Sequence, residues 1–366
     1  MHCAAYSPES KRPGLGVRDY GLRILQVDSG REWRGGQNQV WLLCRELGKD
    51  AGIEQVLVTK HGSELARRAG ADGVAVQGTT WEIGLDPRAW WHLRRTIAAF
   101  RPDVIHVHDS HALTLGATVA LRRTLVAARR VDFHVGRFGF WRRPDRIIAV
   151  SEAVKQILTR DGIAAGAITV VHDGIDPDQI RRAATPALDI RSQLRIPAGA
   201  PLAVNAAALV DHKDQRTLVR AAQQARALEP QLHWIIAGEG PLRAALSAEI
   251  ARLELEDRVH LVGYVDRIDA LIAEASVFVM SSKTEGLGSV ILNALALGRP
   301  VVATAAGGIP ELLPAEVLVP VGTPDALAQK VVDVLKRPPT TPPPFPPRFT
   351  ASAMAQGVLD VYRALL

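Results

Sequence analysis

The residues best suited to chemistry stand together in one short segment, Glu285, Gly286, Leu287, Gly288 and Ser289. An apolar run at residues 277–280 precedes it and predicts a buried strand, and an apolar helix is expected over residues 289–297. A carboxylate among glycines, where a strand passes to a helix, lies where an α/β sheet binds its ligands. Glu285 could act on such a ligand, although a helix N-terminus also favours an acid there for stability alone.

Two adjacent glycines, Gly35 and Gly36, lie between a strand predicted at residues 22–27 and a helix expected from about Gln37 to Gly48. Glycines in such a turn let backbone N–H groups approach a phosphate at the helix N-terminus. A turn that only requires a positive φ would use the same pair. Taken alone, the two glycines leave both explanations open.

Histidines and acids gather at the end of the strand predicted at residues 103–107. His106 and His108 share one face of that strand, whereas Asp109 begins the next helix, so the side chains diverge. A metal site is therefore less favoured than a helix cap at Asp109 or Ser110. His108 is expected to line the crevice at the end of the strand.

Strands and helices alternate through the first half of the chain, with strands expected at residues 22–27, 54–59, 74–76, 103–107, 125–128 and 146–150. Such alternation predicts a parallel sheet with helices on both faces. The same order starts again at residues 202–206, and 366 residues exceed what one hydrophobic core usually organises. The sequence therefore predicts an α/β protein with two doubly wound domains.

Three motifs in the second half carry a family resemblance: Glu-Gly-Leu-Gly at 285–288, Gly-Arg-Pro-Val-Val-Ala-Thr at 298–304 and Gly-Gly-Ile-Pro-Glu at 307–311. Together they resemble the donor-site signature of the family 4 retaining glycosyltransferases, which have the GT-B fold. The resemblance covers nearly the whole chain from Leu22 onward. It implies two Rossmann-like domains that face each other across a cleft, with the acceptor bound by the first and the nucleotide sugar mostly by the second.

The resemblance also divides the chain. We expect a loose tail at 1–20, an acceptor domain at 21–180, a donor domain at 181–336, a proline-rich strap at 337–350 and a helix at 351–366. The tail lacks the apolar core of a signal peptide. The final helix resembles the segment that GT-B proteins send back to pack on the first domain.

Two positions of the signature carry the expected sugar and ribose contacts. Glu285 matches the first acid of a glutamate pair, and the resemblance places it close to the transferred sugar. Asn293 stands where the second acid, associated with the nucleotide ribose, is usual. An amide carbonyl still accepts a hydrogen bond from a hydroxyl, so we expect weaker donor binding rather than loss of the chemistry.

The expected diphosphate site depends on one lysine. Lys213 matches a lysine that faces the diphosphate in the family, whereas Ala208 stands where an arginine is usual. One unit charge about 4 Å from a phosphate contributes roughly 4 kcal/mol at an effective dielectric near 20. Lys213 and the backbone N–H groups of Gly35 to Gln37 and Gly286 to Ser289 would then neutralise the leaving group, with no metal or cofactor.

The resemblance assigns the remaining candidates by position. Backbone near Gly263 and Tyr264 would meet the nucleotide base. Many family members have a histidine near the end of the strand at 125–128 that faces the donor sugar, and Arg130 stands nearest to that place, with Asp132 as the other candidate.

Basic and aromatic residues alternate from Arg129 to Arg143. Arginines meet phosphates and aromatic rings prefer the headgroup level, so this segment suits an anionic membrane or a lipid-linked acceptor. A solvated loop with some aromatic side chains turned inward fits the composition equally well. Single-stranded nucleic acid would use similar residues, but no nucleic-acid-binding module accompanies them.

The composition agrees with a protein of a reducing compartment. The two cysteines, Cys3 and Cys44, are far apart and lack metal-like spacing. No uninterrupted apolar stretch reaches bilayer length. We expect a cytoplasmic protein, acting at the inner face of the membrane if the basic segment binds lipid.

These features predict transfer of a sugar from a nucleotide donor to a hydroxyl of a surface glycan or lipid-linked saccharide, as in lipopolysaccharide or surface polysaccharide synthesis. Two alternatives stay open. A nucleotide-sugar epimerase of GT-B fold would need acid and base groups but no acceptor. A degenerate, non-catalytic partner protein would be consistent with Ala208 and Asn293.

Overall fold

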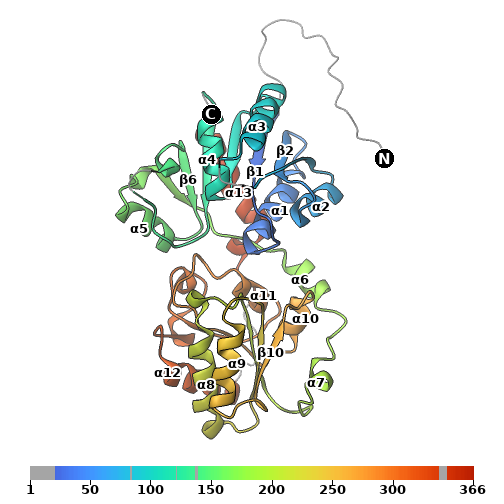
Figure 1. The fold of residues 1–366 in the computed structure, drawn as a ribbon, viewed down its shortest axis with the longest axis vertical. Coiled ribbons are helices and arrows are strands. Elements are labelled where there is room, and N and C mark those ends of the chain that lie inside the picture. Colours follow the sequence, from blue (N-terminus) through green and yellow to red (C-terminus); the bar gives the residue numbers. More distant parts are fainter. Residues whose placement is uncertain (1–20, 83–84, 121, 137–138, 338–343) are drawn as a thin grey trace, which may run out of the picture.

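The computed structural model describes residues 21–82, 85–120, 122–136, 139–337 and 344–366. The predicted tail at 1–20, Cys3 and residues 338–343 of the proline-rich strap lie outside these residues. Two parallel sheets, each covered by helices on both faces, follow one another along the long axis (Figure 1). The predicted two-domain α/β architecture is confirmed.

The first sheet has seven strands in the order β3-β2-β1-β4-β5-β6-β7. Their order reverses between β1 and β4, the switch point at which doubly wound sheets bind ligands. The strands are β1 (Leu22–Val27), β2 (Ile53–Lys60), β3 (Ala75–Thr79), β4 (Val104–Val107), β5 (Thr124–Arg129), β6 (Arg146–Ala149) and β7 (Ile168–Val170).

Local capping explains the helix bounds in this domain. Asp86 accepts hydrogen bonds from two backbone N–H groups and Pro87 opens α3, which ends at Arg101 in the left-handed conformation. Ser151 caps α5, and Asp109 caps α4 as predicted. The helices are α1 (Gly35–Leu47), α2 (Glu64–Ala71), α3 (Pro87–Phe100), α4 (Ser110–Val119) and α5 (Glu152–Arg160).

The second sheet has six strands in the order β10-β9-β8-β11-β12-β13, with its switch point between β8 and β11. The strands are β8 (Leu202–Ala206), β9 (His233–Ala237), β10 (Val259–Gly263), β11 (Val277–Met280), β12 (Val301–Thr304) and β13 (Leu318–Val319). The last strand, β13, is short because Ala315–Val317 before it forms a 3₁₀ turn.

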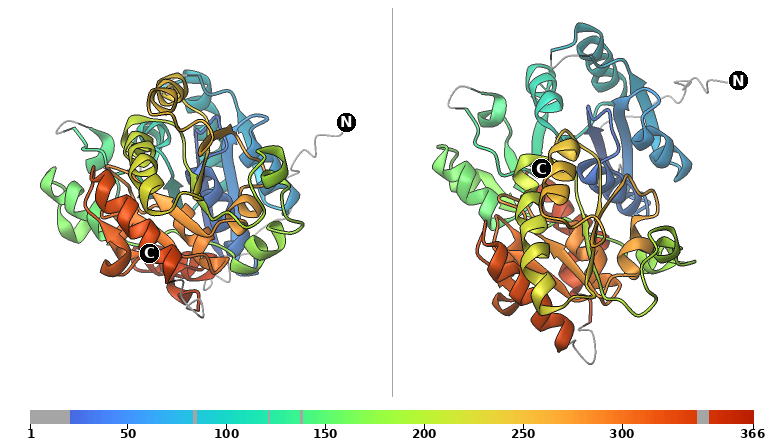
Figure 2. Two further views of the ribbon diagram at one scale, coloured as in Figure 1. Left: turned by 90° about the horizontal axis from the view of Figure 1, so that it is seen from below. Right: turned by 60° about the horizontal axis from the view of Figure 1, so that its bottom comes forward.

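Helices α8 (Gln215–Leu228) and α12 (Pro324–Lys336) lie side by side on one face of the second sheet (Figure 2). Leu218 and Val331 from these helices are fully buried against strand residues such as Ile236. The remaining helices of this half are α9 (Arg243–Arg252), α10 (Ile268–Ala273) and α11 (Val290–Ala296). Residues 241–242 form a turn, so helix α9 begins after Pro241.

The chain crosses between the domains twice, and the two crossing segments pair with each other. The first leads into α6 (Pro177–Ala183) and α7 (Ile190–Gln193), and the second leads into α13 (Ala351–Arg363). Ile175 donates its N–H to the Phe349 carbonyl at 2.9 Å and accepts from Ala351 at 2.7 Å. A Cβ on Gly174 would lie 2.3 Å from the Thr350 carbonyl oxygen, so only glycine permits this approach.

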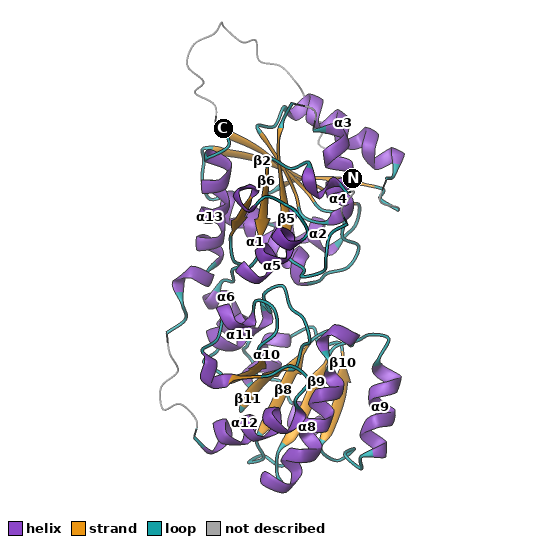
Figure 3. Ribbon diagram, turned by 90° about the vertical axis from the view of Figure 1, so that its left-hand side faces the viewer, coloured by secondary structure: helices purple, strands orange, loops and turns teal. Residues whose placement is uncertain are grey.

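Helix α13 packs on the first domain, beside α1 (Figure 3). Its Tyr362 is fully buried there, and Met354 and Val358 join the same apolar cluster as Val40 and Leu43. The end of the chain therefore forms part of the first domain's core. None of the helices in the described residues is long and apolar enough to span a membrane.

Candidate active site

Glu285 and Lys213 meet at the switch point of the second sheet. Lys213 Nζ donates a hydrogen bond to Glu285 Oε1 at 2.5 Å, and Ser282 Oγ donates to the same oxygen at 2.9 Å. Glu285 is only 7% exposed. The loops after β8 and β11 adjoin because these two strands are neighbours, so parallel pairing brings together two residues 72 positions apart.

Two glycines hold the backbone of Glu285 in place. Gly307 has a φ of +50°, and a Cβ there would lie 1.8 Å from the Glu285 carbonyl oxygen. The N–H of Gly308 donates to that same oxygen at 3.1 Å. The Gly-Gly-Ile-Pro-Glu motif therefore positions the carboxylate by packing against its main chain.

The glycine that follows Glu285 contacts the first domain. Ser151 Oγ donates to the Gly286 carbonyl at 2.6 Å, and a Cβ on Gly286 would lie 2.1 Å from the Arg130 carbonyl oxygen. Leu287 is buried and points into the core, so only its backbone can face a ligand. Gly288 has a φ of +82°, which turns the chain into α11.

The glycines of the first domain lie opposite this loop. Gly35 and Gly36 start α1, and a Cβ on Gly35 would be 3.8 Å from Ser289 Oγ. A Cβ on Gly36 would meet nothing within 4 Å. The first turn of α1 contains no acidic residue. Both glycine loops named by the sequence therefore face one another across the domain boundary.

Beside α1 lies a carboxylate that sequence reasoning missed. Asp28 is 1% exposed; it accepts from the Gly30 N–H at 2.8 Å and from Gln37 Nε2 at 3.3 Å. Burial and the nearby charge of Asp109 raise the pKa of Asp28 to about 6. Its place directly after β1, at the carboxyl end of a parallel strand, was the available signal.

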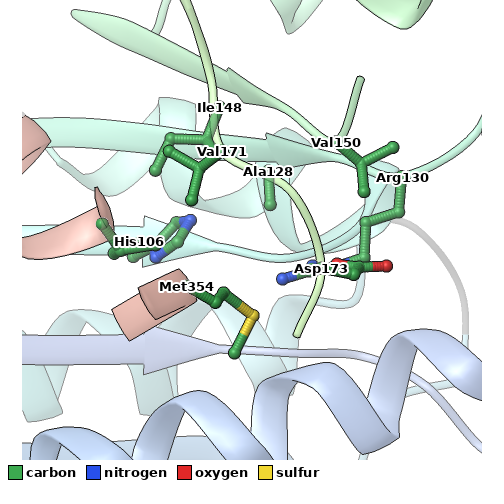
Figure 4. A pocket seen from close by; sticks show the side chains of 9 residues that line it. His106, Ala128, Arg130, Ile148, Val150, Val171, Asp173 and Met354 are labelled. Atoms are coloured by element: carbon green, nitrogen blue, oxygen red, sulfur yellow. The ribbon is translucent and has the colours of Figure 1, made fainter. Parts of the chain in front are cut away.

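His108 and Arg130 belong to a buried polar network. Arg130 Nε donates to Asp173 Oδ1 at 3.1 Å, and Figure 4 shows these two side chains together at the pocket wall. The nearest guanidinium nitrogen of Arg130 is 3.4 Å from His108 Nδ1, and His108 Nε2 lies 2.7 Å from Gln26 Oε1. Arg130 is thus ion-paired with Asp173, and its side chain makes no hydrogen bond to Glu285.

His106 extends this network to the last helix. Its Nδ1 lies 2.6 Å from the Tyr362 hydroxyl, and its ring centroid is 4.1 Å from that of His108. Burial, together with Arg130, lowers the pKa of both histidines well below its ordinary value. They are therefore neutral at physiological pH. Among the residues the structure describes, no three His, Cys, Asp or Glu side chains gather as metal ligands.

The remaining candidates make contacts of their own. Asp132 is half-buried with its charge near Arg129. Gly263 has a φ of +75° and accepts from the Gly238 N–H at 2.8 Å, while Tyr264 is 69% exposed. Asn293 Nδ2 donates to Asp269 Oδ1 at 2.7 Å, and Asp269 was not among the residues picked from the sequence.

The basic segment is only partly available to a partner. Arg129 is buried, donates to the Phe133 carbonyl and stacks 4.8 Å from the ring centroid of Trp141, so the expectation that it meets phosphates is wrong. Arg142 and Arg143 are exposed, as is Phe133 at 53%. Residues 137–138 lie outside the described part of the chain.

Two doubly wound parallel domains, with a charged pair at the switch point of the second sheet, are the architecture of the GT-B fold. The model of Glycosyltransferase Family 4 matches residues 33–179, and that of Glycosyl transferases group 1 matches residues 187–344. The chain therefore belongs to the glycosyltransferase family that these two models describe.

Two curated relatives from Streptomyces match over most of this chain. The 2-deoxystreptamine N-acetyl-D-glucosaminyltransferase of Streptomyces fradiae is 28% identical over 82% of this chain and 82% of its own length. The 2-deoxystreptamine glucosyltransferase of Streptomyces kanamyceticus is 27% identical over 75% of this chain and 66% of its own length. A putative colanic acid biosynthesis glycosyltransferase of Escherichia coli is 29% identical over 52% of this chain and 48% of its own.

Solved structures share the fold. Anabaena Alr3699/HepE, determined with UDP and glucose, has a TM-score of 0.80 at 21% identity, covering 94% of this chain and 100% of its own. A sucrose-phosphate synthase from Thermosynechococcus elongatus has a TM-score of 0.75 at 21% identity, covering 94% and 99%.

Proposed function

We propose that this glycosyltransferase moves a sugar from a nucleotide-diphosphate donor to a hydroxyl of a glycan or lipid-linked acceptor, with retention at the anomeric carbon. The observation that carries the proposal is the pairing of Glu285 with Lys213 at the switch point of the second sheet. Relatives in colanic acid and amylovoran biosynthesis support a surface polysaccharide or lipopolysaccharide as the product.

The pair suits cleavage of a bond that separates charge. As the bond from the anomeric carbon to the phosphate oxygen breaks, positive charge develops on the sugar and negative charge on the diphosphate. A carboxylate stabilises the first and an ammonium the second, and in a buried site both act more strongly than in water. The new bond then forms to the acceptor oxygen, whose proton leaves with the diphosphate or solvent.

Lys213 supplies the positive charge to the leaving group in this proposal, supported by N–H groups of the loop at 286–289 and of the opposite loop at 35–37. We assign no metal to this step. Solved relatives with UDP and with UDP-glucose favour a uridine nucleotide as donor. The acceptor would enter from the first domain, and exposed Phe133 and Arg143 could bring the protein to an anionic membrane at the cytoplasmic face.

Glu285→Gln tests the assignment. We expect transfer and donor hydrolysis to fall about a hundredfold or more, the usual cost of removing one preorganised electrostatic group. Glu316→Gln, at an exposed carboxylate of the same domain, is the matched control. Near-normal turnover by Glu285→Gln would remove Glu285 from the mechanism. Incubation with donor alone separates transfer from epimerisation, because an epimerase would change the sugar without an acceptor.

A further inference from the structure

Asp269 is a carboxylate that the proposed mechanism leaves unused. It is the second residue of α10, half-buried, and its Oδ1 accepts a 2.7 Å hydrogen bond from Asn293 Nδ2 on α11. Within the described residues it has no ion-pair partner and accepts no other hydrogen bond. Its other oxygen is not among the buried atoms that lack a partner, so solvent or a ligand can reach it.

The carboxylate of Asp269 lies beside the loop at residues 285–289. Asn293 follows Ser289 by one helical turn and therefore shares its side of α11. Ser289 Oγ faces Gly35 of the opposite domain, at 3.8 Å from the position a Cβ would take there. On the other flank, α10 follows the loop with exposed Tyr264 at the carboxyl end of β10. Asp269 therefore stands between the loop of Glu285 and the loop of Tyr264.

The chemistry of this position selects one part of a nucleotide. A carboxylate repels phosphates and gains little from a flat base, but its two oxygens accept hydrogen bonds from two neighbouring hydroxyls. Carboxylates in doubly wound folds hold ribose in this way. In a nucleoside diphosphate, the ribose with its vicinal hydroxyls lies between the phosphates and the base.

We propose that Asp269, oriented by Asn293, binds the ribose hydroxyls of the nucleotide donor. The inference rests on the proposed function and names a residue for it. Asn293 gives its N–H group to Asp269 and keeps its carbonyl oxygen as a second acceptor. A glutamate at position 293 would instead set two carboxylates against each other. The amide of Asn293 and the carboxylate of Asp269 are thus complementary: the negative charge lies on α10, at Asp269, and not on α11, at position 293.

The test compares UDP with 2′-deoxy-UDP by calorimetry on the full chain. The unaltered protein should prefer UDP by about tenfold or more, as expected for one charge-assisted hydrogen bond. Asp269→Asn should bring the two ligands to within about threefold of each other. The exchange Asp269→Asn/Asn293→Asp returns a carboxylate to the same place and should restore at least half of the preference, expressed as a free energy.

Two results would overturn the inference: no discrimination between the two ligands by the unaltered protein, or an unchanged ratio in Asp269→Asn. A role in folding alone would lower the melting temperature without altering the ratio, and would also contradict it. Failure here is distinct from failure of the proposed function, because sugar transfer by the unaltered protein and its loss in Glu285→Gln do not depend on the ribose contact.

Discussion

The ammonium of Lys213 lies 2.5 Å from the carboxylate of Glu285, although the two residues belong to different strand–helix units of the second domain. Each partially neutralises the charge of the other in a largely buried site. Removing either partner leaves the other charge uncompensated, which separates the pair from an ordinary surface salt bridge.

Lys213→Met should therefore impair both stability and turnover. We expect the rate of transfer to fall about a hundredfold or more, because the leaving diphosphate loses its principal cation. The free energy of unfolding should fall by about 3 kcal/mol or less, since Lys213 is still partly exposed. Initial rates at saturating donor and denaturant unfolding measure the two effects.

Lys213→Arg is the matched control, because it keeps the charge and should recover part of the rate. If Lys213→Met transferred sugar at the normal rate, the lysine would have no part in neutralising the leaving group.

Glu311 links the two domains. Its carboxylate accepts from the N–H groups of Glu152 and Ala153 at the start of α5, at 3.0 and 3.2 Å, and from His172 Nε2 at 2.9 Å. Although burial acts against it, these hydrogen bonds hold the pKa of Glu311 below its usual value. Glu311→Gln should lower the free energy of unfolding by about 1–2 kcal/mol, the usual value of a helix cap.

Because the pKa of Glu311 is lower in the folded protein, its contribution should be present above about pH 4.5, the ordinary value, and be lost as pH falls. Denaturant unfolding at pH 7 checks the size of the effect, with Glu316→Gln as the exposed control. Equal stability of the two variants at pH 7 would show that this contact between the domains stabilises nothing.

Asp28 and the buried histidines should make the free energy of unfolding depend on pH in opposite directions. The folded pKa of Asp28 is about 6, above the unfolded value near 3.9, so its charge destabilises the fold above pH 6 and the penalty disappears as pH falls toward 4. His106 and His108 have lowered pKa values in the folded protein, so they disfavour folding only where the unfolded chain would protonate them. Their burial therefore costs no stability above about pH 6.5, and the folded state loses stability as the pH falls below that value.

Asp28→Asn should accordingly be more stable than the unaltered protein at pH 8, by at most about 3 kcal/mol, and the difference should shrink between pH 6 and pH 4. Denaturant unfolding across this range measures it, with Asp325→Asn, at an exposed carboxylate of α12, as the control. A difference that stays constant with pH would mean that Asp28 does not take up a proton in the folded state.

Membrane contact can be measured with vesicles. Arg143→Ala should weaken binding to vesicles rich in phosphatidylglycerol about fivefold, from about 1 kcal/mol for each basic residue near an anionic surface. Added salt should reduce the binding further. Arg216→Ala, at an exposed arginine of the second domain, should leave it unchanged. Equal binding of the two variants would exclude the segment around Arg143 as the contact.

Local patterns in the sequence predict the elements well. The starts of α3 and α12 are legible in the sequence, because a polar residue followed by proline marks each of them, Asp86 and Pro87 for α3 and Thr323 and Pro324 for α12. Buried strands were recognisable as apolar runs. Tertiary packing, not a local pattern, decides the exposure of aromatic side chains: the adjacent Trp90 and Trp91 both lie in α3, and Trp90 is half-buried whereas Trp91 is 57% exposed.

The sequence by itself determined the fold class, the family resemblance and the two loops that carry Glu285 and Lys213, because strand periodicity, glycine turns and motif spacing are local properties of the chain. Only the tertiary structure decided which charges meet. The pairing of Asn293 with Asp269, the engagement of Arg130 by Asp173 and the burial of Asp28 depend on which strands are neighbours and which helices cross. Such contacts join residues far apart in sequence, and no local pattern encodes their distance.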